Sequence, residues 1–215
     1  MKRVYIYCEG QTEEGFINTV LYPYYFNMGI IVTPILCTTK RTPSAKFKGG
    51  VSSFSKIAKE LAILCKSHPN EIFTTMFDYY AMPSDTPGIE NVDTDIYRKI
   101  KTLENEIDNK LGLDNLFFNL VLHEFEGLLF SKPNEFGNIA DTRIVEELCA
   151  IKDNFKNPEL INNSPITAPS KRLDALIENY PKVQAGSIVG GAIGIDIMIK
   201  ECKHFANWID KIKNS

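Results

Sequence analysis

Short runs of β-branched, aromatic and aliphatic residues recur in the first half of the chain, separated by stretches with helical spacing. Such runs predict buried strands where turn residues bound them. The first run, KRVYIYC, ends at Glu9, and Pro34 in the second run favours a strand at a sheet edge or a bulge. The predicted strands cover residues 2–8, 30–38, 71–77 and 116–122.

Apolar residues with helical spacing lie between and after these strands. In residues 51–67 they recur every three or four positions, which is the period of an amphipathic helix. Thr12, followed by two glutamates, predicts the N-cap of a helix after the first strand. Residues 39–50 and 78–88 have the proline, glycine and charge content of loops. Further helices are predicted at residues 92–111, 142–154, 170–179 and 192–211, with a short helical stretch after residue 126.

Strands that alternate with helices predict an α/β fold with a mostly parallel sheet flanked by helices. The strand signal fades beyond residue 131, so the C-terminal part is predicted to be mainly helical. We expect residues 1–130 to form the α/β core and residues 131–215 to pack on it as an extension, within one structural unit. A chain of 215 residues with 44% hydrophobic and 24% charged residues can bury such a core.

Composition and charge narrow the classes of function. A net charge of -3 argues against tight non-specific coating of DNA, although a local basic patch or a metal ion could still attract phosphates. The apolar runs are too short for a signal peptide or a membrane span, so we expect a cytoplasmic protein. The five cysteines are widely spaced and form no CxxC pair, which predicts buried reduced thiols rather than zinc ligands or disulfides.

Acidic residues follow three of the predicted strands. Glu9 ends the first, Asp78 ends the third, and Glu124 and Glu126 follow the fourth in the segment HEFE, which begins at His123. The carboxyl ends of parallel strands border the ligand crevice of open α/β sheets, so we expect these acids to meet. Clustered carboxylates repel one another unless protons or a cation neutralise them. Oxygen ligands suit Mg²⁺ or Mn²⁺, so the pattern predicts a site for a hard divalent cation.

Each acid also has a structural explanation. Glu9 could stabilise the N-terminus of the following helix, and Asp78 could open a turn. The segment HEFE could start a solvated helix, and it lacks the HExxH spacing of zinc proteases. The coincidence of three strand ends favours the metal site over these separate explanations.

Four segments together resemble one protein family: YCEGQTEEGF, TTMFDYYAMPSDTPG, VLHEFEGLLF and INNSPITAPSKRL. The chain resembles a Toprim-like family of unknown function, related to effector nucleases that partner AAA/ABC-type ATPases in phage defence. These relatives include the tRNA-cleaving PARIS effector and abortive-infection proteins. The resemblance implies a Toprim-like sheet and a Mg²⁺- or Mn²⁺-dependent nuclease acting on RNA, tRNA or DNA. It also implies an ATPase partner encoded nearby, and a homodimer is a further expectation.

The resemblance also assigns roles to single residues. Glu9 matches the Toprim glutamate and would bind the metal or act as general base, and Asp78 matches the first acid of an Asp-x-Asp pair. Tyr80 stands in place of the second aspartate, so Glu124 or Glu126 could supply the missing ligand. The number of metal ions stays open.

Other side chains are candidates for proton transfer and charge neutralisation. His123 could orient a ligand or donate a proton, or it could simply pack at a strand end. Lys171, together with Arg172, could neutralise charge on a reacting phosphate. Alternatively, the two could form the basic start of a surface helix that Ser170 caps.

Nucleic-acid binding has its own candidates. Lys46 and Lys48 lie in the basic loop and could grip a phosphate backbone, as could Arg172, while Tyr80 could stack on a flipped nucleotide. A solvated loop and core packing are the alternatives.

Whether the chain is an enzyme also stays open, since a non-catalytic partner of an ATPase or a small-molecule phosphohydrolase would fit the same acids. IVGGAIGID has neither a P-loop nor the dinucleotide spacing, so ATP binding by this chain is not expected.

Overall fold

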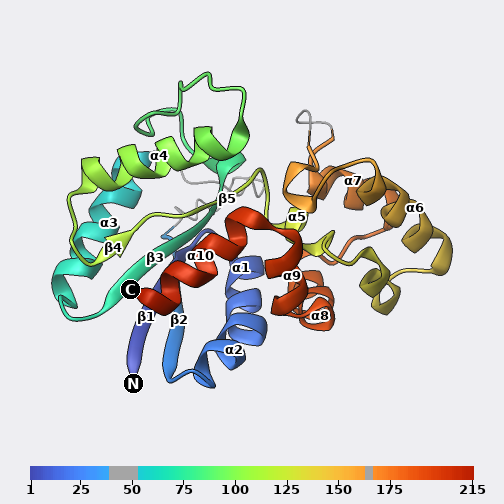
Figure 1. Cartoon of the computed structure of the whole chain (residues 1–215), viewed down its shortest axis with the longest axis horizontal. Helices are drawn as coiled ribbons and strands as arrows, with labels where there is room; N and C mark the ends of the chain where they lie inside the picture. The colour runs from blue at the N-terminus through green and yellow to red at the C-terminus, as the bar shows by residue number, and fades with distance from the viewer. Residues whose placement is uncertain (39–52, 163–166) are drawn as a thin grey trace, which may run out of the picture.

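The computed structural model describes residues 1–38, 53–162 and 167–215. A parallel sheet lies at its centre, with the strand order β2-β1-β3-β4, and β5 also pairs with β3 (Figure 1). The predicted mostly parallel sheet flanked by helices is therefore confirmed. The strands are β1 (Lys2–Cys8), β2 (Ile30–Leu36), β3 (Ile72–Asp78), β4 (Leu116–Phe117) and β5 (Leu120–Val121).

The central strands are buried on both faces, as their continuous apolar sequences require. Val4 and Ile6 of β1 face one cluster of core residues, and Tyr7 faces the other. β2, which contains Pro34, lies at an edge of the sheet, as the sequence predicted. An edge strand has no hydrogen-bonding neighbour on its open side, so it can accommodate the missing N–H of a proline.

Helices cover both faces of the sheet (Figure 1). α3 (Phe54–Ser67) and α4 (Ile96–Leu111) supply the core on the face of Tyr7. α1 (Gln11–Phe16), α2 (Tyr22–Phe26) and α10 (Lys203–Asn214) supply the core on the other face. The sheet thus forms the middle of three layers.

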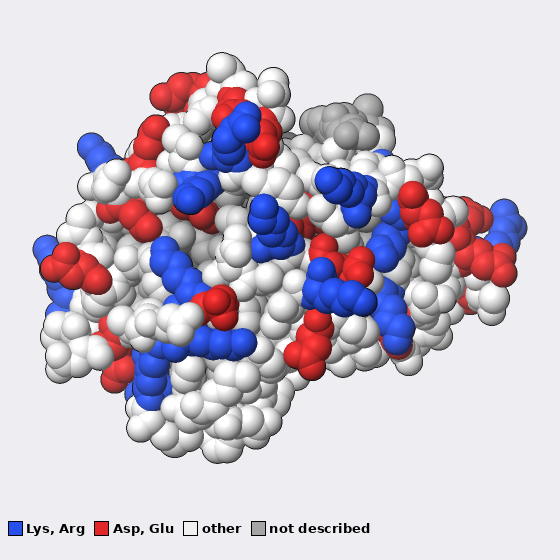
Figure 2. Space-filling view, viewed as in Figure 1, with Lys and Arg blue, Asp and Glu red and all other residues white. Residues whose placement is uncertain are grey.

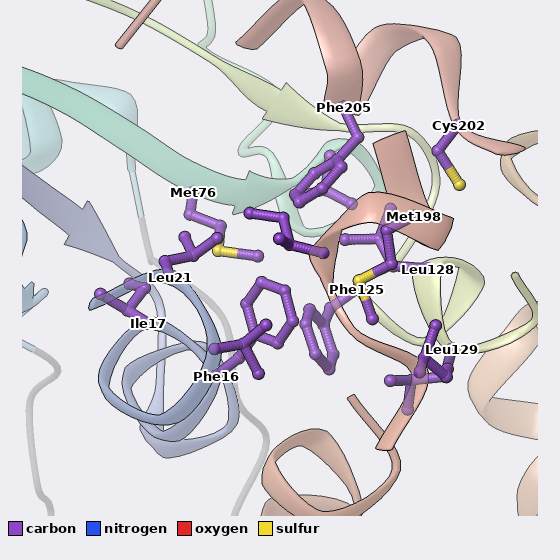
Figure 3. Packing of buried hydrophobic residues seen from close by; sticks show 14 of the residues in the cluster. Phe16, Ile17, Leu21, Met76, Phe125, Leu128, Leu129, Met198, Cys202 and Phe205 are labelled. Atoms are coloured by element: carbon purple, nitrogen blue, oxygen red, sulfur yellow. The ribbon is translucent and has the colours of Figure 1, made fainter. Parts of the chain in front are cut away.

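The remaining helices gather beside the sheet, at the right of Figure 1. Their core is continuous with that of α1: the ring of Phe16 lies 5.1 Å from that of Phe125, and Met198 packs in the same cluster (Figure 3). These helices are α5 (Glu126–Leu129), α6 (Thr142–Asp153), α7 (Pro169–Leu176), α8 (Lys182–Ile193) and α9 (Ile195–Glu201). Short 3-10 or π-helical turns cover Ile17–Leu21, Tyr79–Ala81, Pro133–Asn138 and Pro158–Leu160.

The single helix predicted over residues 192–211 is wrong. Three helices occupy this region, beginning at Lys182, and the chain breaks between them at Gly194 and Cys202. Gly194 has a φ of 76°, which a continuing helix cannot accommodate. The sequence did not predict α8 because its glycines are unusual inside a helix. They allow close packing: a Cβ on Gly186 would lie 3.1 Å from Cγ2 of Thr12 in α1.

Local hydrogen bonds explain two further corrections, and a third concerns the start of α7. Gly10, not Thr12, is the N-cap of α1, because the Glu13 carboxylate turns back to accept the Gly10 N–H at 3.0 Å. The predicted strand 116–122 is split, since the Asn119 N–H and C=O bond to the hydroxyl of Thr75 at 2.8 and 2.7 Å instead of a neighbouring backbone. Ser170 lies inside α7, whose N-cap is Ala168.

The cysteines and the helix lengths add two findings. All five cysteines are free, four of them buried and Cys149 half-buried. No single helix in the described ranges has the length and hydropathy to cross a membrane. By those criteria alone, α8 and α9 taken together could, with a bend of 86° between them.

Candidate metal centre

The carboxyl ends of β1, β3 and β5 bring acidic side chains together. Glu9 directly follows β1, and its carboxyl pKa is raised to about 7. Burial is the largest cause, and the negative charges of Glu13, Glu126 and Glu124 add to it, while Lys182 opposes them. The acids predicted at three strand ends therefore share one electrostatic environment.

Asp78 ends β3 and is held in place by the backbone of the neighbouring segment. Its Oδ1 accepts the Phe125 N–H at 2.7 Å, which joins the end of β3 to the start of α5. The pKa of Asp78 lies well above its usual range, first because of burial and then because of the charges of Glu13, Glu126 and Glu9. One Asp78 oxygen is thus committed to the backbone, and the carboxyl still feels the repulsion of the cluster.

Glu126 is the first residue of α5 and is completely buried. Its Oε1 lies 2.9 Å from Nζ of Lys182, while Oε2 has no hydrogen bond within the described residues. Burial raises the pKa of Glu126, and the ion pair with Lys182 works against that rise. A buried carboxylate oxygen without a donor is costly in a folded protein, so it indicates a place for a ligand.

Lys182 begins α8 and reaches the acids from the C-terminal part of the chain. Burial disfavours its charged form, but the charges of Glu126, Asp78 and Glu13 outweigh this effect and raise its pKa. The side chain is 48% exposed, so it borders solvent while contacting the acids. No local sequence signal marks PKVQAGS as part of a site, and the residue was therefore missed.

Glu13 was also missed, because a glutamate in the first turn of a helix has an ordinary role with the helix dipole. The structure buries it, with 6% of its surface exposed, and burial followed by the Glu126 charge raises its pKa against hydrogen bonds that lower it. A signal was available: Glu13 lies in the first turn of the helix that directly follows the strand end carrying Glu9.

Glu124 and His123 occupy different places from Glu126. Glu124 accepts the Ser170 N–H at 2.9 Å and so ties its segment to α7. His123 adopts a φ of 61°, and burial lowers its pKa to about 4, which leaves it neutral at pH 7. Its Nδ1 has no hydrogen-bond partner in the part of the chain that the structure describes.

Tyr80 stands next to His123, with ring centroids 5.1 Å apart. Its N–H donates to the His123 carbonyl at 3.2 Å, and Asn162 donates to its hydroxyl. The side chain is 43% exposed, so one surface of the ring remains open at the edge of the cluster. The predicted stacking role is untested and stays a prediction.

The predicted basic residues lie elsewhere or outside the described ranges. Lys171 pairs with Asp174 at 3.4 Å on α7, and both side chains are more than half exposed. Arg172 donates from Nε to the Thr167 carbonyl at 2.7 Å. Neither has a contact with the acids among the interactions of the described residues. Lys46 and Lys48 fall in residues 39–52, outside the described residues.

Comparison with known proteins places the chain in a family. A family model matches residues 8–213. The chain belongs to DUF4276, a domain of unknown function. No curated protein matches it. The DUF4276 chain is similar to two solved structures, both C-terminal regions of OLD proteins. The one from Burkholderia pseudomallei is 15% identical, with a TM-score of 0.45 and 98% of each chain covered. The one from Xanthomonas campestris pv. campestris is 16% identical, with a TM-score of 0.40, over 99% of this chain and 96% of that chain.

The acids of this DUF4276 domain suit a hard cation by their chemistry. All are oxygen donors, burial and then mutual repulsion raise the pKa values of Glu9, Asp78 and Glu126, and Glu126 Oε2 lacks a donor within the described residues. They do not form a finished site: within residues 1–38, 53–162 and 167–215, no group of three or more His, Cys, Asp and Glu side chains has metal-binding geometry. Lys182 instead occupies one side of Glu126. A bound cation would therefore require these side chains to close around it.

Proposed function

We propose that the chain is a Mg²⁺- or Mn²⁺-dependent, Toprim-like nuclease that hydrolyses phosphodiester bonds in RNA, tRNA or DNA. One observation carries the proposal: acids at three parallel strand ends repel one another in a buried setting, and Glu126 Oε2 has no donor among the described residues. Asp78 has the Phe125 N–H and Glu126 has Lys182, but one lysine does not balance these acids, and a divalent cation would remove the deficit of positive charge.

Glu9, Asp78 and Glu126 would hold the cation, with Glu13 beside them. When bound, it supplies positive charge to the phosphate and acidifies a water molecule. If the other acids alone hold the cation, Glu9 would instead act as general base toward that water. The Phe125 N–H fixes the orientation of Asp78.

Lys182 complements the acids from the start of α8. It is charged at neutral pH, and its ammonium group reaches both the interior of the cluster and solvent. A phosphate that enters the cluster would find there a cation able to stabilise the charge that develops during cleavage. Following the motif resemblance, we propose further that the chain acts in the cytoplasm as the effector of an AAA/ABC-type ATPase in phage defence.

Glu9→Gln tests the catalytic proposal. It should lower Mn²⁺-supported cleavage of labelled tRNA, duplex RNA or duplex DNA by at least about 10³-fold, because an amide neither takes up a proton nor binds the cation well. The exposed Glu146 on α6 provides the matched control, and Glu146→Gln should cleave like the parent. Equal cleavage by Glu9→Gln and the parent would show that the assigned centre is wrong.

A second function has its own support, because Lys182 already neutralises part of Glu126 and Tyr80 replaces an expected acid. The chain would then be a non-catalytic partner of the ATPase. Thermal unfolding separates the two functions without relying on activity. Under the nuclease proposal, Mn²⁺ raises the unfolding midpoint of the parent and not that of Glu126→Gln. Absence of both this shift and cleavage, with ATPase co-purification that survives Glu9→Gln, would favour the regulatory role.

A further inference from the structure

The C-terminal helix α10 crosses one face of the sheet (Figure 1). Near its start, His204 Nε2 lies 3.0 Å from Oε1 of Glu104 in α4. In the middle, Trp208 donates to the Thr74 hydroxyl of β3 at 2.9 Å. At its end, Lys2 donates to the Ile212 carbonyl at 2.7 Å, beside the first residues of β1. Because β1 and β3 are parallel, α10 runs from the carboxyl edge of the sheet to the opposite edge.

Three lysines of α10 and Lys99 of α4, a helix on the other face of the sheet, lie over aromatic rings. Their ammonium nitrogens are 4.5 to 5.8 Å from the ring centroids, within the range of a cation–π interaction. None of them takes part in an ion pair within the described residues. The pairs are Lys99 with Tyr79, Lys203 with Tyr97, Lys211 with Phe117 and Lys213 with Tyr24.

A lysine placed over a ring differs from one neutralised by a carboxylate. The ring restrains the side chain, so less conformational entropy is lost when an anion binds, and the charge stays available. Basic residues gather over the region of α10 in Figure 2, where an acidic group also lies among them. On the helix itself the opposing charge is the exposed Asp210, against Lys203, Lys211 and Lys213. Asp108 of α4 is a second acid close to Lys211, so the four lysines face two carboxylates, and this set still carries a positive net charge on a chain whose total is -3.

The row of lysines leads away from the candidate metal centre. Tyr79 directly follows Asp78, so Lys99 over its ring marks the edge of the acidic cluster. From Lys203 to Lys213 the helix rises by about 15 Å, and Lys211 and Lys213 lie on opposite flanks of it, over Phe117 of β4 and Tyr24 of α2. Phosphates of one strand are spaced by about 3.4 Å along a duplex axis, so this length corresponds to four or five base steps.

The form of the row favours a duplex over a single strand. Proteins that bind single strands stack bases on open aromatic rings. Here Tyr97, Phe117 and Tyr24 are covered by ammonium groups, which leaves charge rather than ring surface for contact. Point charges along a helix suit a continuous phosphate backbone whose bases are paired inside.

We propose that Lys99, Lys203, Lys211 and Lys213 form a docking surface for the phosphate backbone of a double-stranded nucleic acid. This surface extends from the carboxyl edge of the sheet, where the candidate metal centre lies. This inference rests on the proposed nuclease function and adds the form of its substrate. The row would hold the duplex while the acids act on a phosphate at its end.

Equilibrium binding in EDTA tests the row without cleavage. Anisotropy of labelled 20-base-pair DNA and RNA duplexes and of a single strand should be measured across a salt series. The triple variant Lys203→Gln, Lys211→Gln, Lys213→Gln keeps the aliphatic stems and removes three charges. It should lower the slope of log K against log salt by about 2.7 and weaken duplex binding at least tenfold near 0.1 M salt.

Matched variants control for charge and for folding. The triple variant Lys59→Gln, Lys66→Gln, Lys110→Gln removes three exposed charges on α3 and α4 away from the row and should bind like the parent. Replacement of the three α10 lysines by arginine should preserve binding. The proposal is overturned if the parent binds no duplex, if both Gln variants weaken binding equally, or if the parent binds the single strand more tightly than either duplex.

The outcomes also separate this proposal from the nuclease function. If the parent cleaves with Mn²⁺ but the α10 variants bind unchanged, the row is wrong and the nuclease stands. If the row binds duplex as expected but neither Mg²⁺ nor Mn²⁺ supports cleavage, the nuclease is wrong while duplex docking stands.

Discussion

Two acidic clusters, one of Glu159 and Glu104 around His204 and one of Glu9, Glu13, Asp78 and Glu126 around Lys182, differ in their hydrogen bonds. In the first, Glu159 is 4% exposed and accepts the Tyr97 hydroxyl at 3.1 Å and the N–H groups of His204 and Phe205 at 3.0 and 2.8 Å. In the second, Glu126 is completely buried and has Lys182 on one oxygen and no hydrogen bond on the other, within the described residues.

The difference separates structural carboxylates from candidate functional ones. Glu159 holds the N-terminus of α10, where N–H groups lack intrahelical partners, so its burial is offset by the bonds it makes. Glu126 holds no backbone group, and its neighbours Glu9 and Asp78 repel it. A buried carboxylate oxygen among repelling acids that no donor of the described residues reaches indicates a ligand as the missing partner.

The largest expected effect is on the stability of the first cluster. Glu159→Gln places an amide where two backbone N–H groups need an acceptor, so we expect a loss of about 3 kcal/mol of unfolding free energy. For a chain of this size, that corresponds to a fall of roughly 10 °C in the thermal midpoint. Calorimetry in a metal-free buffer measures it directly.

Glu126→Gln is the matched substitution in the second cluster. It removes a charge that the other acids repel and keeps an oxygen that can accept from Lys182, so its stability should lie within about 1 kcal/mol of the parent, on the stabilising side. If it destabilises the protein as much as Glu159→Gln does, then Glu126 is a structural carboxylate and the contrast between the clusters collapses.

A smaller effect comes from the pH dependence of the second cluster. Glu9 has a pKa of about 7 in the folded state, against an ordinary value of 4.5. Between these two pH values the folded state keeps a proton on Glu9 that the unfolded state has lost. Stability from this group is complete below about pH 4.5 and falls as the pH rises to about 7. The loss should be on the order of 2 kcal/mol in a chelating buffer.

Glu9→Gln should flatten this part of the profile and leave it more stable than the parent at pH 8. Glu146→Gln should keep the slope of the parent, because its carboxyl is exposed on α6. If the stability of the parent instead rises steadily from about pH 4.5 to 7, the carboxylates of the second cluster do not repel one another as proposed.

The sequence predicted one part of this contrast well. Glu9, Asp78 and HEFE each follow an apolar strand, and the rule for parallel sheets was enough to expect them at one edge. The same reasoning could not supply Lys182, because its place depends on how α8 packs against α1, over 160 residues earlier in the chain. Nor could it supply Glu159, whose partners become visible only once the break at Cys202 starts α10.

The smallest expected effect tests how α8 packs against α1, which the sequence could not predict. A Cβ on Gly186 would lie 3.1 Å from Cγ2 of Thr12 and 3.2 Å from Cε1 of Phe125, so Gly186→Ala must move α8 or its neighbours. We expect a loss of about 1 kcal/mol and a weaker effect of Mn²⁺ on the thermal midpoint, since Lys182 moves with the helix.

Gly191→Ala on the same helix provides the control, because a Cβ there meets no atom within 4 Å. An exposed glycine inside a helix costs about 0.5 to 1 kcal/mol relative to alanine, so this variant should be slightly more stable than the parent and respond equally to Mn²⁺. If both variants gain stability alike, the contact between α8 and α1 has room for a methyl group. The position of Lys182 beside Glu126 would then not depend on glycine at 186. The ion pair with Glu126 alone would hold the Lys182 ammonium group in the second cluster.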